Sequence, residues 1–442
     1  MNKKNSALSP QRWRQRKLTD DNREIHVVKA TFHIEAASVD RLRLFLGNSN
    51  GGTLWFLLTA ERAGALKAEA YTVDEGNESY AVLPAAESGE GVHRSAALPG
   101  EAKAVLSRAS LPERLMVETR MVGKTAFIYA NGIFLAAYEL KAAIDGDVTQ
   151  AGTVVEDTLA SVPQLVHFDV QHKPGKFMHI SFDDTYDLMK ELTVNETRYN
   201  SLFDHEVFAY LRDMHEKYGA VFSFYLFYGR TDDAFTMSDM TTKFKDEFAT
   251  HADWLKFGYH SLYEDTRSSR LSDEEMIASV GNMHAAITRF AGADSIDKLV
   301  RFGYFSVNTS ALIALKRQGL IDGALTADDE RTDNCGLSGA PLRIVRHYDS
   351  YADLEHQLHY FRSERRFDGC DSSERMVSQL NALRDDGNNN ECYILFGHSV
   401  LEIPITAALQ WACEQGDIAF RYPMNIERDL RRQSNRHLTN EA

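Results

Sequence analysis

The stretch "KFMHISFDDTYDL", residues 176–188, marks the point where the character of the chain changes. A short apolar run, Phe177 to Phe182, leads directly into two adjacent carboxylates, Asp183 and Asp184. Buried strands rarely end on paired like charges, because desolvation raises the pKa of one carboxyl and its neighbour raises it further. A bound metal ion would resolve this conflict, and so would exposure in a loop. The stretch therefore predicts a buried strand that ends either at a metal ion or in a solvent-exposed loop.

Beyond this stretch, strand patterns alternate with helix patterns. The runs "VFSFYLFY" (221–228) and "WLKFGYH" (254–260) are strand-length. Apolar spacing predicts a helix over 204–217 that Asp204 caps and Gly219 ends, and a second helix after the capping box "SDEE" (272–275). Such alternation predicts a parallel α/β sheet or barrel, whose reactive groups gather at the carboxyl ends of the strands. "SFDD", "FGYHS" and "ILFGHS" all lie at such ends.

Before this stretch, residues 22–172 show the period of β structure with almost no helical spacing. Asn131–Gly132 separates two apolar runs in "FIYANGIFLAAY" (127–138), which predicts a two-residue hairpin. "RLRLFLGNSNGGTLWFLLTAE" (41–61) repeats the strand–turn–strand pattern. These features predict an all-β sandwich. The first hairpin resembles those of concanavalin-like and laminin-G-like sandwiches, which implies either glycan binding or a scaffold role.

The length of 442 residues indicates two or three domains. We expect a disordered basic tail over 1–21, the sandwich over 22–172, an α/β domain over 173–428 and a polar tail over 429–442. A formal charge of −15 argues against a nucleic-acid partner, and no apolar run approaches the ~20 residues of a membrane span. The basic start has no apolar core typical of a signal peptide, and the four cysteines are scattered. These observations favour the cytoplasm.

Four motifs appear in a fixed order, "SFDDTY", "FGYHSLYED", "RFGYF" and "ILFGHS". In this order they resemble the motif series of the polysaccharide deacetylase superfamily (NodB homology, carbohydrate esterase family 4). The resemblance covers about residues 176–425. It implies a distorted (β/α) barrel and a hydrolase that uses a divalent metal to remove acetyl groups from N- or O-acetylated sugars.

The resemblance implies a role for each matching residue. Asp183 matches the catalytic base, and Asp184 and His260 match metal ligands. The implied metal is zinc, with manganese, nickel and cobalt as alternatives. The chain departs from the family pattern at Glu264, where a second histidine is usual, and Asp265 follows it. Either carboxylate could replace the missing ligand, or a water molecule could take its place.

The remaining motifs imply the rest of the active site. Arg301 matches the arginine that pairs with the catalytic carboxylate, and the backbone N–H of Tyr304 falls where the family stabilises an oxyanion. His398 matches the general acid, with Leu395 and Phe396 as walls of the acyl pocket. The acidic partner of His398 is expected between residues 305 and 390, and the candidates are Asp328, Asp329 and Asp349.

Two other polar stretches are interpreted as surface. "HQLH" holds His356 and His359 in what we interpret as a charged, exposed helix. "RSERRFDGCDSSERM" (362–376) is a mixed charge run, typical of a solvated face or a lid.

The sequence therefore supports two hypotheses. The first is a metal-dependent hydrolase that removes an acetyl or other acyl group from a sugar or glycan precursor. The second is a deacetylase-like protein that has lost its metal ligands and binds a glycan or a protein partner. The sequence leaves the oligomeric state open.

We predict that the sandwich folds by itself, because the apolar period changes from two to 3.6 residues after about residue 170. Residues 20–172 expressed alone should show a β-type circular dichroism spectrum and one cooperative urea transition. A helical spectrum or a transition without cooperativity would move the domain boundary.

Overall fold

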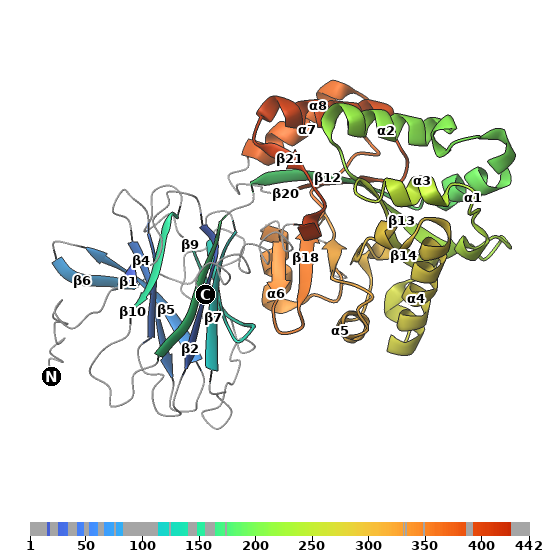
Figure 1. Ribbon diagram of the computed structural model, residues 1–442. Coiled ribbons are helices and arrows are strands. Elements are labelled where there is room, and N and C mark those ends of the chain that lie inside the picture. Colours follow the sequence, from blue (N-terminus) through green and yellow to red (C-terminus); the bar gives the residue numbers. More distant parts are fainter. Residues whose placement is uncertain are drawn as a thin grey trace, which may run out of the picture. The chain divides into compact units, whose positions relative to one another are not determined.

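The computed structural model shows a chain of two compact units. It describes residues 175–425 except 330, 332–333, 348–349 and 386–391, and earlier in the chain 16–17, 25–33, 42–47, 53–60, 66–74, 77–82, 114–122, 125–139, 148–154 and 164–172. Unit 1 comprises Met1–Pro174, Asp353–Glu355 and Arg428–Ala442. Unit 2 comprises Gly175–Ala352 and His356–Glu427. Each unit has its own architecture (Figure 1).

Unit 1 contains two antiparallel sheets. Its strands are β1 (Arg16–Lys17), β2 (Ile25–His33), β3 (Leu42–Gly47), β4 (Thr53–Ala60), β5 (Leu66–Asp74), β6 (Asn77–Val82), β7 (Arg114–Val122), β8 (Thr125–Ala130), β9 (Ile133–Glu139), β10 (Gln150–Val154) and β11 (Gln164–His172). One sheet has the strand order β1-β10-β3-β4-β5-β6, and the other has the order β11-β2-β7-β8-β9. Their register is set by direct antiparallel pairing, for example Leu44 opposite Phe56.

The two sheets of unit 1 share one apolar core, as expected for a sandwich. Phe32 of β2 and Ile128 of β8 come from one sheet, and Leu44 of β3 and Phe56 of β4 come from the other. The hairpin β8–β9 turns at Asn131–Gly132, where both residues have positive φ angles of 49° and 85°. This is the backbone that a two-residue hairpin requires and that Asn-Gly adopts most easily. The predicted sandwich and its hairpin are confirmed.

The expected tails lie mostly outside the described residues. Within 1–21, the described residues Arg16 and Lys17 form the short strand β1, which pairs with Thr153 and Gly152 of β10. The rest of that segment and the whole of 429–442 lie outside the part of the chain that the structure describes.

Unit 2 alternates strands and helices. Its strands are β12 (Lys176–Asp183), β13 (Phe222–Gly229), β14 (Leu255–Tyr263), β15 (Leu299–Val300), β16 (Gly323–Thr326), β17 (Ser350–Asp353), β18 (Leu358–Arg362), β19 (Arg365–Arg366), β20 (Cys392–Gly397) and β21 (Ile418–Phe420). Its α-helices are α1 (Tyr186–Val194), α2 (Glu206–Tyr218), α3 (Lys245–Thr250), α4 (Asp273–Phe290), α5 (Thr309–Arg317), α6 (Gly339–His347), α7 (Ser373–Asp385) and α8 (Glu402–Gln415).

The strands of unit 2 form two sheets. The larger has the order β14-β13-β12-β20-β19, with β21 also pairing with β12, and these pairings are parallel. The smaller has the order β15-β16-β18-β17. A single bridge, Phe257 to Ile296, links them on one side, and the Glu364 N–H donates to the Ile394 carbonyl at 2.8 Å on the other. The predicted parallel α/β architecture is present, while the closed barrel stays a prediction.

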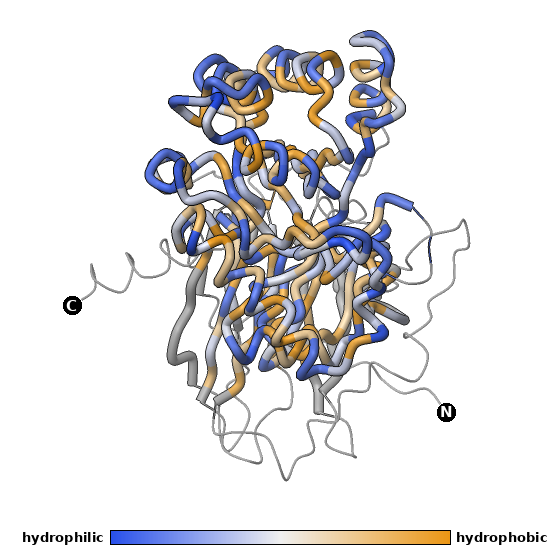
Figure 2. Tube along the Cα trace, turned by 90° about the vertical axis from the view of Figure 1, so that its right-hand side faces the viewer, coloured by the Kyte–Doolittle hydropathy of each residue, from blue (hydrophilic) through white to orange (hydrophobic). Residues whose placement is uncertain are grey.

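Each helix buries one face against these sheets. Figure 2 shows hydrophobic and hydrophilic residues alternating along the helices. In α4, the residues Met276, Val280, Met283, Ile287 and Phe290 are buried as the spacing predicts, and Ser272 and Glu275 form the expected capping box. Helix α2 ends at Gly219 as predicted, with a φ of 75°.

The predicted start of α2 was wrong. Its N-cap is His205, whose Nδ1 accepts from the Val207 N–H at 3.2 Å. Asp204 instead closes a short 3-10 turn, where its carboxylate accepts from the Asn200 and Ser201 N–H groups. Asp204 is a good capping residue by type, and a preceding turn used that capacity first.

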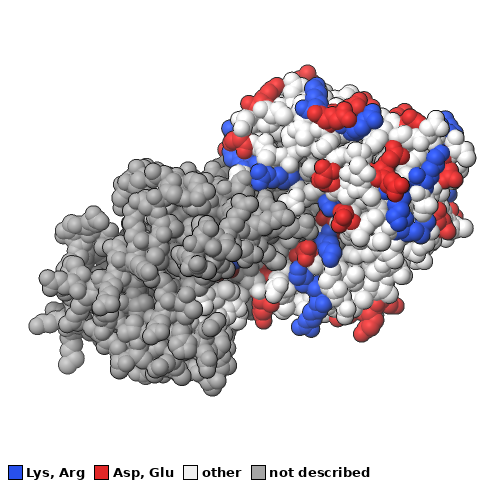
Figure 3. All heavy atoms as spheres, viewed as in Figure 1, with Lys and Arg blue, Asp and Glu red and all other residues white. Residues whose placement is uncertain are grey.

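Charged side chains of both signs lie on the surface of unit 2 (Figure 3). On the face drawn in Figure 3, acidic and basic side chains are interspersed and form no extended basic patch. None of the helices that the structure describes is long and apolar enough to cross a membrane.

We predict that Gly323→Ala strongly destabilises unit 2. A Cβ at Gly323 would lie 1.9 Å from the backbone oxygen of His359 on the paired strand β18, and a rotamer change cannot relieve a contact between backbones. We expect a loss of about 3 kcal/mol in the free energy of unfolding, measured by urea titration. Gly281→Ala is the matched control, because a Cβ there meets nothing within 4 Å and alanine favours the helix α4. Equal stability of the two variants would contradict the packing.

Candidate functional site

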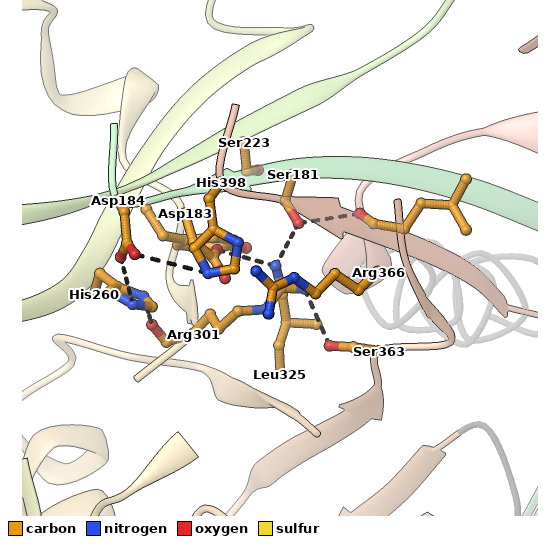
Figure 4. Close-up of polar contacts among 12 residues, drawn as sticks. Ser181, Asp183, Asp184, Ser223, His260, Arg301, Leu325, Ser363, Arg366 and His398 are labelled. Atoms are coloured by element: carbon orange, nitrogen blue, oxygen red, sulfur yellow. Dashed lines mark hydrogen bonds and ion pairs between the residues drawn. The ribbon is translucent and has the colours of Figure 1, made fainter. Parts of the chain in front are cut away.

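The expected site residues lie at the carboxyl ends of neighbouring parallel strands. Asp183 ends β12, His260 lies late in β14, and His398 follows β20 directly. Arg301 follows β15 in the smaller sheet. Figure 4 shows these side chains converging, with Asp184 between the rings of His260 and His398. Positions more than 200 residues apart in sequence thus meet at one edge.

Asp183 and Arg301 form a buried ion pair at the base of this cluster. The Arg301 Nη1 donates to Asp183 Oδ1 at 3.0 Å and to Ser181 Oγ at 2.8 Å. Its Nη2 donates to Ser363 Oγ at 3.1 Å. Arg301 is 0% exposed and Asp183 is 3% exposed. The pair therefore fixes the carboxylate in one orientation, as charge-assisted hydrogen bonds do best.

Aromatic rings enclose the guanidinium on its remaining sides. The Cζ of Arg301 lies 4.4 Å from the centre of the Phe396 ring and 5.4 Å from that of Tyr225. Burial and, next, the charge of Arg301 lower the pKa of the neighbouring His179 to about 3. His179 is therefore neutral at physiological pH, and Asp183 is the carboxylate that balances Arg301.

Asp184 and His260 face each other next to the Asp183–Arg301 ion pair. The Nδ1 of His260 lies 2.7 Å from the carbonyl oxygen of Arg301. A carbonyl only accepts, so Nδ1 carries a proton, and Nε2 is the ring nitrogen that faces Asp184. That Nε2 lies 3.1 Å from Asp184 Oδ1, a buried oxygen without a hydrogen bond from any described group. Two lone pairs facing each other need a proton or a metal cation between them.

The electrostatics of Asp184 agree with a cationic neighbour. Burial acts to raise the pKa of Asp184, but the contact with His260 and the charges of His260, His398 and Arg366 outweigh it and lower the pKa. Asp184 also has a positive φ of 58°, an uncommon conformation for aspartate. Strained backbone of this kind is frequent at ligand-binding sites. The two residues therefore fit a divalent cation as a carboxylate and a neutral imidazole ligand.

A third protein ligand is absent at this point. Glu264 lies in an exposed turn, and its carboxylate pairs with Arg230 at 3.2 Å. Asp265 is exposed in the same turn. Among the residues that the structure describes, no group of three or more His, Cys, Asp or Glu side chains could hold a metal ion. The structure thus does not bring Glu264 or Asp265 to Asp184 and His260.

His398 is held by an aspartate that the sequence did not single out. Its Nδ1 lies 2.5 Å from Asp368 Oδ2, and its backbone N–H donates to Asp368 Oδ1 at 2.8 Å. The hydrogen bond to Asp368 raises the pKa of His398, against the effect of burial. Its Nε2 faces Asp184 Oδ2 at 3.7 Å. His398 is thus an oriented imidazole that favours its protonated form.

Two of the expected partners of His398, Asp328 and Asp329, were therefore wrong. Asp329 pairs with Arg331 instead, and Asp349 lies outside the described residues. Asp328 and Asp329 follow β16, whereas Asp368 follows β19, the strand that pairs directly with β20. Strand pairing brings Asp368 to His398, and that pairing cannot be seen from motif order.

The interpretation of "RSERRFDGCDSSERM" as a solvated face or a lid was wrong for its first part, while Asp371 and residues 373–375 are exposed. Arg365 and Arg366 pair with Leu395 and Phe396 in the larger sheet, and Ser363 and Glu364 are buried. His359, expected on an exposed helix, lies in β18 and is 4% exposed. The charges in this run hid the strand, although Ser363 and Glu364 are buried in unit 2 and Ser363 accepts a hydrogen bond from Arg301.

The expected pocket residues differ in position. Phe396 lies beside Arg301 and 6.5 Å from the His398 ring, between ring centres. Leu395, next along β20, is fully buried, and strand alternation turns its side chain to the other face. Gly303 lies close to His260, since a Cβ there would be 3.6 Å from His260 Nε2. The backbone N–H of Tyr304 is therefore close to the site, while the side chain of Tyr304 is exposed.

Comparisons with known proteins give solved structures only. No protein-family model and no curated protein matches the chain. A mutant of a CE4 family pseudoenzyme with restored enzymatic activity is similar over 58% of this chain and 76% of that chain, at 11% identity and a TM-score of 0.31. A tetrameric galectin from the ball sponge Cinachyrella sp. is similar over 36% of this chain and 99% of its own, at 13% identity and a TM-score of 0.25.

The carbohydrate-binding module CBM66 from Bacillus subtilis is similar over 36% of this chain and 93% of its own, at 9% identity and a TM-score of 0.21. At these TM-scores, the role of each unit has to be argued from the residues of this chain.

We predict a pH-dependent stability effect of Asp368→Asn. The raised pKa of His398 stabilises the fold below its unfolded value of 6.5, and this contribution is lost as pH rises through the folded pKa. Although burial opposes it, contact with His398 lowers the pKa of Asp368 from 3.8 to about 2, so its contribution is present above 3.8. Asp368→Asn should therefore lower the free energy of unfolding most between pH 3.8 and pH 6.5, and less at pH 9.

Urea unfolding at several pH values measures this difference. Asp371→Asn is the control, because Asp371 is a nearby carboxylate with 82% side-chain exposure. A destabilisation by Asp368→Asn that is the same at pH 5.5 and pH 9 would contradict the ion pair.

Proposed function

We propose that unit 2 is a hydrolase that removes an acetyl or other acyl group from an N- or O-acylated sugar. The observation that carries the proposal is the pair of acid–base groups on either side of Asp184. Asp183 is fixed by Arg301 at 3.0 Å, and His398 is fixed by Asp368 at 2.5 Å. A positioned carboxylate and a positioned imidazolium are what acyl transfer to water needs as general base and general acid.

We further propose that the two sheets of unit 2 form one distorted (β/α) barrel. The segment 358–366 supports this, because it pairs with β16 through β18 and then with β20 through β19. The bridge from Phe257 to Ile296 links the sheets on the other side. The site then lies at the carboxyl end of the barrel, where reactive groups of such folds gather.

Asp184 and His260 would hold a divalent cation, and zinc is the first candidate. When bound, it would polarise the acyl oxygen and lower the pKa of a water molecule. The Arg301 carbonyl fixes the tautomer of His260 in which Nε2 can bind the cation. With two protein ligands, water or substrate must complete the coordination, and we expect weak metal affinity.

The other residues of this chain would carry the proton transfers. Asp183 accepts a proton from the attacking water through the oxygen that Arg301 leaves available. His398 donates a proton from Nε2 to the departing nitrogen or oxygen, while Asp368 keeps Nδ1 protonated and stabilises the positive ring. The backbone N–H of Tyr304 is the candidate donor for the oxyanion.

The competing proposal is a deacetylase-like binding protein without catalysis. It is favoured by one observation, the pairing of Glu264 with Arg230 where a third ligand would be expected. In that case unit 2, together with the sandwich, would bind a glycan or a protein partner and would release no acetate or other carboxylic acid.

Acetate release from N- and O-acetylated sugars, with zinc, manganese, nickel or cobalt added, tests the proposal. We expect metal-dependent release by the wild type. Asp183→Asn should lower the rate by about 10² to 10⁴ because an amide cannot accept the proton, and it should retain the metal. His398→Ala should slow amide substrates more than esters, because an amine must be protonated to leave.

Metal titration followed by elemental analysis separates the roles. Asp184→Ala and His260→Ala should abolish binding, whereas Glu264→Gln and the exposed control Asp187→Asn should leave it unchanged. No release by the wild type with any of these metals, or wild-type rates in Asp183→Asn, would favour the binding protein.

A further inference from the structure

Tyr304 is an aromatic side chain that unit 2 leaves open at the edge of the site. It is 49% exposed, and few other large hydrophobic side chains in the described residues are as exposed. It follows Gly303, where an added Cβ would lie 3.6 Å from His260 Nε2. A ligand bound at Asp184 and His260 would therefore extend past the Tyr304 ring.

The backbone holds this ring outward in an unusual way. Tyr304 and Phe305 both have positive φ angles, 58° and 55°, which side chains other than glycine rarely adopt. The turn places Phe305 inside, where its ring packs edge-on against Phe396 at 6.2 Å, and leaves Tyr304 outside. Burial of the Tyr304 side chain does not offset the strain of its backbone, because the side chain is half exposed. This points to a functional reason for its position.

Arg267 lies over the Tyr304 ring with its Cζ 5.0 Å from the ring centre. It is exposed, and within the part of unit 2 that the structure describes it pairs with no carboxylate. Arg230, Arg331 and Arg366, by contrast, each pair with an acidic side chain. Arg267 is therefore a cation whose hydrogen-bond donors are available beside the site.

The two loops that carry this pair are tied together. The hydroxyls of Ser269 and Ser306 lie 2.5 Å apart, and Asn308 Nδ2 donates to the Ser269 carbonyl at 2.9 Å. Arg267 and Tyr304 are thus held in place before a ligand arrives, which reduces the entropy lost on binding.

We propose that Arg267 and Tyr304 bind an anionic sugar, either a uronic acid unit or a sugar phosphate. The Tyr304 ring stacks on the apolar face of the pyranose, and the guanidinium binds the carboxylate or phosphate in a bidentate manner. This inference rests on the proposed function, because it names the substrate class of that site. It gives the acidic protein a local means of accepting an acidic substrate.

Binding to the full-length protein, measured by isothermal titration calorimetry in 50 mM salt, tests this. The probes are glucuronic acid, N-acetylglucosamine 1-phosphate, neutral N-acetylglucosamine and inorganic phosphate. We expect at least one anionic sugar to bind about tenfold more tightly than the neutral sugar, and the tighter of the two identifies the anion. Arg267→Gln should remove this preference, while Arg270→Gln, the same charge change at the other end of the short 3-10 helix that Arg267 precedes, should keep it.

Tyr304→Ala should weaken all three sugars about fivefold, and Tyr304→Phe should restore binding. Equal affinity for neutral and anionic sugars in the wild type would overturn the proposal. So would equal losses in Arg267→Gln and Arg270→Gln, full affinity in Tyr304→Ala, or inorganic phosphate binding as tightly as the sugar phosphate. Because no turnover is measured, a protein that binds these sugars without releasing acetate would refute the hydrolase and leave this inference standing.

Discussion

The burial of the Arg301 guanidinium is the constraint on which unit 2 depends. A charge that is 0% exposed is tolerated only if it is paired and hydrogen-bonded. Asp183 and Ser181 come from the larger sheet, and Ser363 lies where the chain passes from the smaller sheet to the larger. Removing one partner of such a pair typically costs about 3–5 kcal/mol. The pair therefore joins the two sheets while it fixes the candidate base.

The same residue also orients the candidate metal site. The Arg301 carbonyl accepts a hydrogen bond from His260 Nδ1–H and so directs Nε2 toward Asp184. Asp184 and Tyr304 both have positive φ angles of 58°. Stability and chemistry are thus coupled, because one side chain and its own carbonyl position both a carboxylate and an imidazole.

The charges around the site divide it into distinct roles. The hydrogen bond to Asp368 raises the pKa of His398 and favours its protonated form, whereas the Arg301 carbonyl binds Nδ1 of His260 and leaves Nε2 toward Asp184, so the two histidines near Asp184 serve different purposes. Arg230 holds Glu264 at the surface, and this removes a ligand that the motif pattern would place at the metal. Whether two protein ligands suffice is a question about metal affinity, and it separates the enzyme from the binding protein.

The sequence alone determined the elements and most of the site. Period-two and helical spacing predicted the sandwich, the Asn131–Gly132 hairpin and the alternating strands, because backbone geometry imposes these periods locally. The order of the motifs predicted that these five residues lie at strand ends: Asp183, Asp184, His260, Arg301 and His398. Only the tertiary structure decided that Asp368 binds His398, that Glu264 pairs with Arg230 and that the charge run 362–366 enters the sheet. Those choices depend on which strands become neighbours and on the partners that a buried Arg301 requires, and neither leaves a periodic signal in the chain.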